Sequence, residues 1–448
     1  MMRTLAALLL VALFPLPLVA QPPPIRLTLA DAIARGFDTS HRLAEVRARE
    51  QGALAAVRGA HLADRPIVTA SAGYLRTNHV TEFAFGQGSA RTVVYPDIPD
   101  NVVSRVSFQW PIYTSGRVDA LERAAAAEAQ AVGADIETTR ADLRLEIVRA
   151  YWAAATAREA VRVLEESTAR ADAQLRDARQ RFAVGLVPPN EVSSLEAQRS
   201  REQAQLIEAS NIRESTLVDL RRLIGADPET VIELADLLDQ AGASSASGAS
   251  GASGASGAGA LVQEALERRP ERKALNLRLD GVEARQQAAM TANKPTVAVG
   301  AGVDYANPNS RIFPRKGEWQ ESWDVSVNVS WAFLDFGRIK AQVAEVAATA
   351  TATRERIAEF DSVVAADIRQ RLLDLDSSQA VVKAASDAVR SAAEARRVVG
   401  DRFAAGVATS TDVVVAQVAM LEAELARTRS LAGVRLAEAR LHRSLGRP

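Results

Sequence analysis

Side chains that commonly carry out catalysis or bind metals are few and scattered in this 448-residue sequence. There is no cysteine, which excludes disulfides, thiolate metal sites and cysteine nucleophiles. No serine, histidine and carboxylate fall into a catalytic context, and charged residues are spread along helical segments. We therefore expect no enzyme, no metal site and no cofactor. The four histidines have no metal-ligand spacing: His41, His61, His79 and His442.

Two carboxylates stand at matching places after sharp turns. Glu191 follows the segment RFAVGLVPPN, and Asp412 follows RFAAGVATST. We expect each to open a helix, where the helix dipole favours a negative charge, with Asn190 or Thr411 as the N-cap.

The matching turns belong to an internal repeat. The segment SFQWPIYTSGRVDA at 107–120 matches NVSWAFLDFGRIKA at 328–341, and the turns at 181–192 and 402–413 share the offset of 221 residues. Before these segments the offset becomes about 229, so the first copy carries about eight extra residues between its strands. We expect them in an exposed loop.

Two copies of one unit fill the sequence after an apolar N-terminal segment. The start, MMRTLAALLLVALFPLPLVAQ, has the layout of a secretory signal peptide, although a membrane anchor is the alternative. A Gly/Ala/Ser-rich segment separates the copies and is predicted to be a flexible linker, with a docking segment for a partner as the alternative. The expected ranges are 1–20 for the signal peptide, 21–225 for the first repeat, 226–260 for the linker and 261–448 for the second repeat.

Each repeat reads as a helix, two strands, a very long helix and a returning helix. At about 1.5 Å per residue the long helix spans about 100 Å. Its apolar positions step by four and three, as in a coiled coil, and its many alanines favour helices side by side; a single helix pair is the alternative. The expected ranges are 29–62 (from the cap Thr28), 67–112, 116–182 and 191–224 in the first repeat, and 261–291, 296–333, 337–403 and 412–445 in the second.

The strands alternate apolar and polar residues. Segments of about ten such residues are typical of membrane β-barrel strands, whereas a soluble β-sandwich is the alternative. Four strands in an open sheet would leave two edges unpaired, so the simplest closure is a barrel shared by three chains, with twelve strands and a polar lumen. The residues expected to face lipid are Val106, Phe108, Trp110, Val325, Val327, Val329, Trp331 and Phe333.

The signal peptide, the doubled topology and the paired RFAVGLVPPNEV and RFAAGVATSTDV turns resemble the TolC-like outer membrane efflux family, also called outer membrane factors. The resemblance implies a mainly α-helical chain with a membrane β-barrel part. It implies that a homotrimer in outer membrane lipid closes the barrel and continues it as a long α-helical barrel across the periplasm. It also implies export of drugs, toxic small molecules or proteins, in tripartite efflux or type I secretion, with a periplasmic adaptor and an inner-membrane pump as partners.

The resemblance also implies roles for the turns. Glu191 and Asp412 would narrow the channel at its periplasmic tip, although Ser194 and Val415 stand where the family channel that defines this feature has a second Asp. The adaptor would contact Val184, Gly185, Leu186, Ala405, Gly406 and Val407. Independently of the family, the glycine in each turn is expected at positive φ, where the helix ends.

Charge and topology limit the other functions. With 54 basic and 55 acidic residues, the sequence gives no electrostatic reason to expect a nucleic-acid partner. A periplasmic coiled-coil adaptor, or a structural protein of an export complex, is the alternative to a channel. Adaptors have helical hairpins too, but lack four strands of the lipid-facing pattern.

Overall fold

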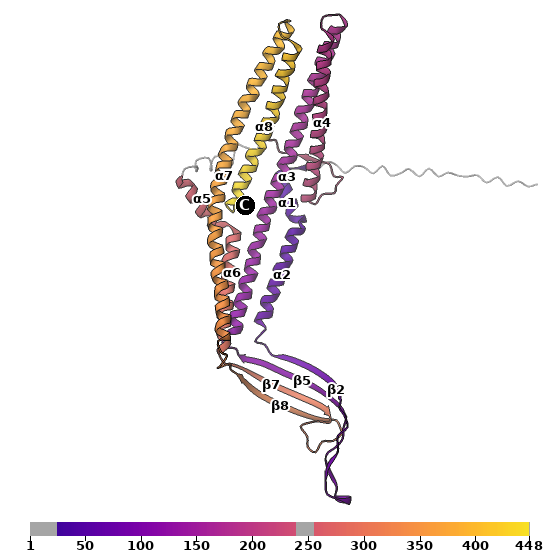
Figure 1. Cartoon of the computed structure of the whole chain (residues 1–448), viewed down its shortest axis with the longest axis vertical. Coiled ribbons are helices and arrows are strands. Elements are labelled where there is room, and N and C mark those ends of the chain that lie inside the picture. Colours follow the sequence, from indigo (N-terminus) through magenta and orange to yellow (C-terminus); the bar gives the residue numbers. More distant parts are fainter. Residues whose placement is uncertain (1–24, 239–254, 448) are drawn as a thin grey trace, which may run out of the picture. The chain divides into compact units, whose positions relative to one another are not determined.

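The computed structural model describes residues 25–238 and 255–447 (Figure 1), so the predicted signal peptide and most of the Gly/Ala/Ser-rich segment lie outside it. The chain is mainly helical. None of the helices in these two ranges is long and apolar enough to cross a membrane. The elements are β1 Ile25–Leu27, α1 Leu29–Thr39, α2 His41–His61, β2 Ile67–Arg76, β3 Phe83–Phe85, β4 Thr92–Tyr95, β5 Asp100–Tyr113, α3 Arg117–Ala183, α4 Pro189–Leu223, β6 Ile232–Leu234, α5 Ala255–Arg268, α6 Pro270–Met290, β7 Thr296–Asn307, β8 Gln320–Ser330, α7 Arg338–Ala404 and α8 Ser410–Ser444, with short 3-10 turns at Gly88–Ala90 and Thr291–Asn293.

The two repeats have matching long helices. Both α3 and α7 contain 67 residues, and both returning helices, α4 and α8, contain 35 residues. Their bounds differ from the expected ones by one or two residues. The hydrophobic period and the turn glycines were therefore sufficient to locate these elements.

The helix before the strands was predicted as one piece in each repeat, and this was wrong. In the first repeat Ser40 is extended, with ψ of 113°, and separates α1 from α2. In the second, Arg269 is extended with ψ of 122° before Pro270, because a proline disfavours helical geometry in the residue that precedes it. The expected start of α1 is confirmed, since Thr28 and Asp31 form a reciprocal capping box.

The predicted linker, 226–260, contains regular structure at both ends, which corrects that prediction. β6 pairs in parallel with β1, and α5 begins at Ala255. The buried hydroxyl of Tyr151 on α3 lies 3.1 Å from the Leu27 carbonyl oxygen and 2.8 Å from Asp236 Oδ2, which ties both strands to the helix. Burial raises the pKa of this tyrosine above its ordinary value.

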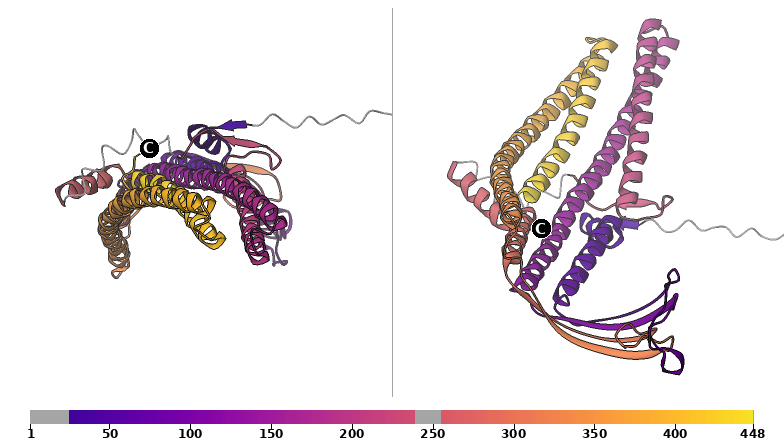
Figure 2. Two further views of the ribbon diagram at one scale, coloured as in Figure 1. Left: turned by 90° about the horizontal axis from the view of Figure 1, so that it is seen from above. Right: turned by 60° about the horizontal axis from the view of Figure 1, so that its bottom comes forward.

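The four long strands form one antiparallel sheet in the order β2-β5-β7-β8 (Figure 1). The strands bend along their length (Figure 2). The central β5 and β7 come from different repeats, and Val102 pairs with Asn307. The outer strands β2 and β8 each have one unpaired edge in the single chain. The extra residues of the first repeat lie between β2 and β5, in the stretch that contains the small β3-β4 hairpin.

The alternation of residues in the strands gives the sheet two unlike faces. Val325, Val327 and Val329 on β8 share one face and are each about two-thirds exposed in the single chain, at 66%, 66% and 67%. Strand β8 ends at Ser330, so the predicted strand to 333 is too long. The remaining predicted lipid-facing residues are Val106, Trp110, Trp331 and Phe333, which are exposed, and Phe108, which is half-buried.

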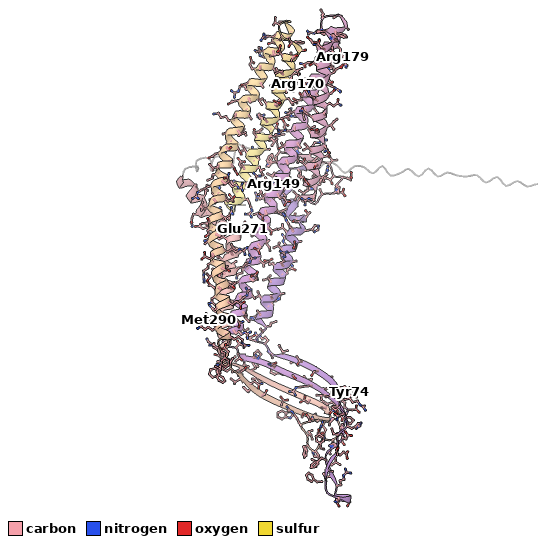
Figure 3. The ribbon with its side chains drawn as sticks, viewed as in Figure 1. Tyr74, Arg149, Arg170, Arg179, Glu271 and Met290 are labelled. Atoms are coloured by element: carbon pink, nitrogen blue, oxygen red, sulfur yellow. The ribbon has the colours of Figure 1, made fainter. Side chains whose placement is uncertain are left out.

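The chain divides into two compact units, and both long helices contribute to each. One unit contains residues 25–40, 143–238 and 375–439, with the turns, the whole of α4 and most of α8. The other contains residues 41–142, 255–374 and 440–447, with the sheet. In the sheet unit, Tyr74 near the C-terminal end of β2 donates a 2.7 Å hydrogen bond to Asp100 at the start of β5 (Figure 3). Met290, at the end of α6, lies where the helices of this unit lead into the sheet (Figure 3).

Candidate functional site

Both helical turns end their long helices in the same way. In the first turn, the Gly185 N–H donates to the Phe182 carbonyl at 2.9 Å, and the Leu186 N–H donates to the Arg181 carbonyl at 2.9 Å. The second turn repeats these bonds at 3.0 and 2.9 Å, from Gly406 and Val407. This is the Schellman arrangement, which needs a residue at positive φ. Both glycines have φ of 76°, which confirms the prediction from sequence.

The turns present apolar side chains to solvent. Val184 is 70% exposed, Leu186 is 74% exposed and Val407 is 63% exposed. The other three predicted contact residues, Gly185, Ala405 and Gly406, are also exposed. Exposed aliphatic side chains at the end of a helical hairpin form a surface suited to an apolar partner.

The N-terminus of α8 is closed by a capping box. The Thr409 N–H and hydroxyl both donate to Asp412 Oδ2, at 2.9 and 2.8 Å, and the Asp412 N–H returns a bond to Thr409 Oγ1 at 3.3 Å. Thr409 is therefore the N-cap, and the prediction of Thr411 was wrong by two residues. The hydrogen bond from the Thr409 N–H, followed by that from its hydroxyl, holds the pKa of Asp412 below its ordinary value.

The N-terminus of α4 starts differently. Pro188 is the N-cap, with φ of −77° and no side-chain cap bond, so Asn190 lies inside the helix and its prediction as N-cap was wrong. Glu191 occupies the place that Asp412 has in α8. Because Pro188 has no N–H, Glu191 cannot form the reciprocal bond of a capping box. The two carboxylates therefore occupy equivalent positions, but only Asp412 is held by a capping box.

The two turns are joined by an arginine. The Arg181 guanidinium lies 5.3 Å from the centre of the Phe403 ring, so a cation from the first repeat rests on an aromatic ring from the second. Arg181 also makes a 2.9 Å ion pair with Asp177 within α3. The contact with Phe403 brings the two hairpins of this unit together near their turns, and the ion pair with Asp177 orients the arginine.

A buried polar group joins α3 to α4 behind the first turn. Glu202 is 1% exposed, and its two oxygens accept hydrogen bonds of 2.8 Å from Ser167 Oγ and Gln198 Nε2. The side-chain oxygen of Gln198, Oε1, in turn accepts a 2.8 Å bond from Arg201. Because a buried carboxylate is costly without donors, this network fixes the register of the two helices. Further along α3, the Arg170 guanidinium lies 3.6 Å from the carboxylate of Glu424 on α8. Arg179 lies nearer the turn at the end of α3 (Figure 3).

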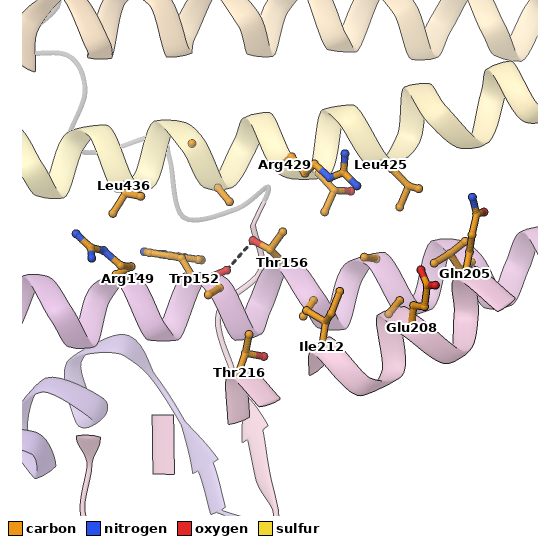
Figure 4. Close-up of a pocket in the computed structure, with 18 residues that line it drawn as sticks. Arg149, Trp152, Thr156, Gln205, Glu208, Ile212, Thr216, Leu425, Arg429 and Leu436 are labelled. Carbon is orange, nitrogen blue, oxygen red and sulfur yellow. Dashed lines mark hydrogen bonds between the residues drawn. The ribbon is translucent and has the colours of Figure 1, made fainter. Parts of the chain in front are cut away.

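A cavity of about 630 Å³ lies between α3, α4 and α8 of the same unit (Figure 4). Its walls are mostly apolar, with Trp152, Ile212 and Leu425, and Arg149 and Arg429 also contribute to the lining. The Thr156 hydroxyl beside it donates a 2.6 Å bond to the Trp152 carbonyl. The Thr156 hydroxyl in the cavity wall therefore already donates its proton within α3.

The predicted lipid-facing tryptophans are anchored alike in both repeats. Trp110 Nε1 donates to the Asp64 carbonyl oxygen at 3.1 Å, and Trp331 Nε1 donates to the Asn293 carbonyl oxygen at 2.8 Å. Both acceptors lie just after the helix that leads into the strands. An indole with one polar anchor and an exposed ring is typical of a membrane interface.

Sequence reasoning placed the turn glycines and carboxylates correctly but missed their neighbours. Thr409 was overlooked although Thr followed three residues later by an acidic residue is a capping-box signature. Arg181 and Phe403 belong to the repeated RFA segments, but nothing local shows that they meet. Within residues 25–238 and 255–447, no group of three His, Asp or Glu side chains could hold a metal ion.

Comparison with known proteins gives one consistent family. The sequence profile described as outer membrane efflux protein matches residues 37–226 and 261–447. The chain is 28% identical to Protein CyaE of Bordetella pertussis over 324 residues, 70% of this chain and 62% of CyaE, so the match spans less than two thirds of that relative. It is 23% identical over 391 residues to outer membrane protein TolC of Vibrio cholerae, covering 86% of this chain and 83% of TolC. Its fold is similar to the outer membrane protein VceC of Vibrio cholerae, with a TM-score of 0.74 and 19% identity over 93% of this chain and 96% of VceC.

Proposed function

Because the chain belongs to the outer membrane efflux protein family, we propose that three copies form a passive channel for drugs, toxic small molecules or proteins, in tripartite efflux or type I secretion. Proteins of this TolC-like family are non-enzymatic transport proteins of the Gram-negative outer membrane that extend into the periplasm, and this chain is one of them. The trimer, the partners and the exported class are the proposed parts.

The observation that carries the proposal is the four-stranded sheet. Its β2 and β8 edges are unpaired, and one face exposes Val325, Val327 and Val329. An open edge is unfavourable in water and in lipid, whereas an apolar face is unfavourable only in water and is stabilised by contact with lipid. Pairing β8 of one chain with β2 of the next satisfies both edges, and three chains give a closed barrel of twelve strands.

Cysteine cross-linking tests this closure, because the chain has no cysteine of its own. We combine Ala72→Cys on β2 with a single cysteine at Trp323, Val325 or Val327 on β8, all on the same face of the sheet. One of these pairs is expected to yield covalent trimers on oxidation. The control pair, Val106→Cys with Val325→Cys, places β7 between the cysteines and is expected not to cross-link.

Fractionation and growth tests address the same proposal in cells. The protein is expected in the outer membrane as a detergent-resistant trimer, and its deletion is expected to increase sensitivity to toxic compounds. Recovery as a water-soluble periplasmic monomer, with no cross-linking for any β2 and β8 pair, would refute the channel and favour the coiled-coil adaptor.

We propose that the two turns contact the periplasmic adaptor, through which an inner-membrane pump is coupled. The exposed Leu186 and Val407 supply apolar surface at the turns of two long helical hairpins, each ended by a glycine at positive φ. Leu186→Asp and Val407→Asp are expected to reduce adaptor co-purification while the trimer is retained. The matched control Leu54→Asp, on exposed α2, is expected to leave adaptor binding unchanged. Equal loss in all three variants would argue against the turns.

Asp412 and Glu191 are proposed to narrow the channel at the same end. The capping box restrains Asp412, whereas Glu191 cannot form one. We therefore expect Glu191 to be the more mobile of the two carboxylates. Replacing both by Ala is expected to raise single-channel conductance above that of the unmodified trimer; an unchanged conductance would remove the constriction from the proposal.

A further inference from the structure

The polar face of the sheet carries an arginine that reaches across three strands. Arg105 lies on β5, and its Nη1 atom donates to both carboxylate oxygens of Asp304 on β7, at 3.0 and 2.8 Å. Its Nη2 atom donates to Asp324 Oδ1 on β8, the strand beyond, at 2.9 Å. Its Nε atom donates to Ser107 Oγ at 3.1 Å. The guanidinium is therefore held from several directions.

A glycine makes this path possible. Gly302 on β7 pairs with Ser107 on one side and Asp324 on the other, so it lies directly under the Arg105 side chain. A Cβ atom at this position would lie 2.8 Å from Arg105 Cζ and 3.1 Å from Asp324 Oδ1. The first distance is too short for a van der Waals contact, so any larger residue would lift the guanidinium off the sheet.

The charges of this cluster balance. Arg311, in the loop after β7, donates to the same Asp324 Oδ1 at 2.9 Å and to the Trp323 carbonyl at 3.0 Å. Two arginines thus face two aspartates, of which Asp304 is only 9% exposed. With Arg105 lying flat, the surface presents paired charges, whereas a lifted Arg105 would project one positive charge and leave both aspartates with fewer donors.

We propose that Arg105 sets the ion selectivity of the barrel lumen, and that Gly302 keeps its guanidinium flat against the wall. This inference rests on the proposed function, which makes the polar face of the sheet the wall of the lumen. In such barrels, substitutions on the lumen side change selectivity while leaving the lipid side intact. The arrangement keeps the long, positively charged side chain of Arg105 out of the path that permeating ions follow.

The test measures reversal potential and conductance of purified trimers in planar lipid bilayers under a KCl gradient, with Asp412→Ala and Glu191→Ala present in every trimer compared so that the proposed constriction does not limit the current. Gly302→Ala is expected to lower conductance and shift selectivity toward chloride, and Arg105→Ala to shift it toward potassium. At about 7 Å in water, a unit charge raises the energy of one ion and lowers that of the other by about RT each, so each shift should change the permeability ratio roughly sevenfold. The double variant is expected to match Arg105→Ala alone, because the alanine acts only through the guanidinium.

The neighbouring glycine supplies the matched control. A Cβ at Gly300, on the same face of the same strand, would lie 2.8 Å from Ser326 Oγ, an uncharged group. Gly300→Ala is therefore expected to leave selectivity unchanged. A Gly302→Ala trimer that selects ions like the unmodified one, or a double variant that keeps the chloride shift, would overturn the proposal.

A chemical readout does not depend on conduction. Modification of intact trimers by p-hydroxyphenylglyoxal, followed by peptide mapping, is expected to be roughly tenfold faster at Arg105 in Gly302→Ala, because a charge-assisted hydrogen bond changes an equilibrium by about that factor. Equal rates would overturn the inference. If the unmodified protein forms no trimer and no pore, the proposed function itself fails first, whereas normal pores with equal Arg105 reactivity refute only the role of Gly302.

Discussion

A lysine placed on one or the other face of β8 distinguishes lipid from lumen. Val325 lies at the middle of the strand, is 66% exposed and pairs with Ala301. The next residue, Ser326, points to the opposite face and pairs with Gly300. Val325→Lys would place an ammonium in the hydrocarbon of the bilayer, whereas Ser326→Lys would place the same group in water.

The difference in free energy is large enough to decide assembly. A lysine on the lipid face costs about 2–4 kcal/mol near the bilayer midplane. Three chains bring the same charge, so the proposed trimer loses about 6–12 kcal/mol. Folded proteins are stable by only about 5–15 kcal/mol, so we expect Val325→Lys to lose most of its trimer. Ser326→Lys should cost little, since its ammonium stays hydrated.

The assay compares trimer bands on unheated gels of outer-membrane fractions, and urea unfolding of protein refolded into lipid vesicles. Val325→Lys should give little trimer and a lower midpoint in urea, with Ser326→Lys close to the unmodified protein. If both variants assemble equally well, or if Ser326→Lys alone fails, the assignment of the faces is wrong.

Three further outcomes follow from the turns and from the buried network. Asp412→Asn should speed hydrogen exchange of the first turn of α8, while Glu191→Gln leaves α4 unchanged because no capping box exists there. Because the pKa of Asp412 is lowered in the folded chain, the stabilisation that its carboxylate gives α8 should be complete above the ordinary pKa of about 4 and should decline as the pH falls through the lowered pKa. Hydrogen exchange of the first turn of α8, corrected for intrinsic rates, should then become faster. An exchange rate that does not change with pH would contradict the capping role. Ser167→Ala removes one donor from the buried Glu202 and should cost about 1–3 kcal/mol in thermal unfolding, whereas no change would show that water replaces the hydroxyl.

Much of the fold follows from periodicity in the sequence. The strand faces could be predicted because Val325, Val327 and Val329 alternate with polar residues, and a one-residue error would have reversed every side chain. The long helices were equally evident, since their apolar pattern persists over many turns and ends at a turn glycine. The family profile confirms the resemblance read from the paired turns.

The parts that escaped prediction depend on distant contacts or on very short segments. Three-residue β6 is too short to show a period; it is held by its pairing with β1 and by the bond from Tyr151 to Asp236, which lies just after the strand. The path of Arg105 joins residues 199 and 219 positions away in the chain, so no local pattern could reveal it. The error at Thr409 is different, because its capping-box signature was present in the sequence and was overlooked.

The strand order also constrains how the chain folds. Because β5 and β7 are neighbours in the sheet but belong to different repeats, pairs such as Val102 and Asn307 must close a loop of about 200 residues. Contacts so distant in sequence form slowly. The first repeat therefore leaves the ribosome with β2 and β5 able to pair only with each other, and their apolar surface must wait for the second. A chain of this design has its greatest need of chaperones before the barrel exists, while the incomplete sheet is still in water.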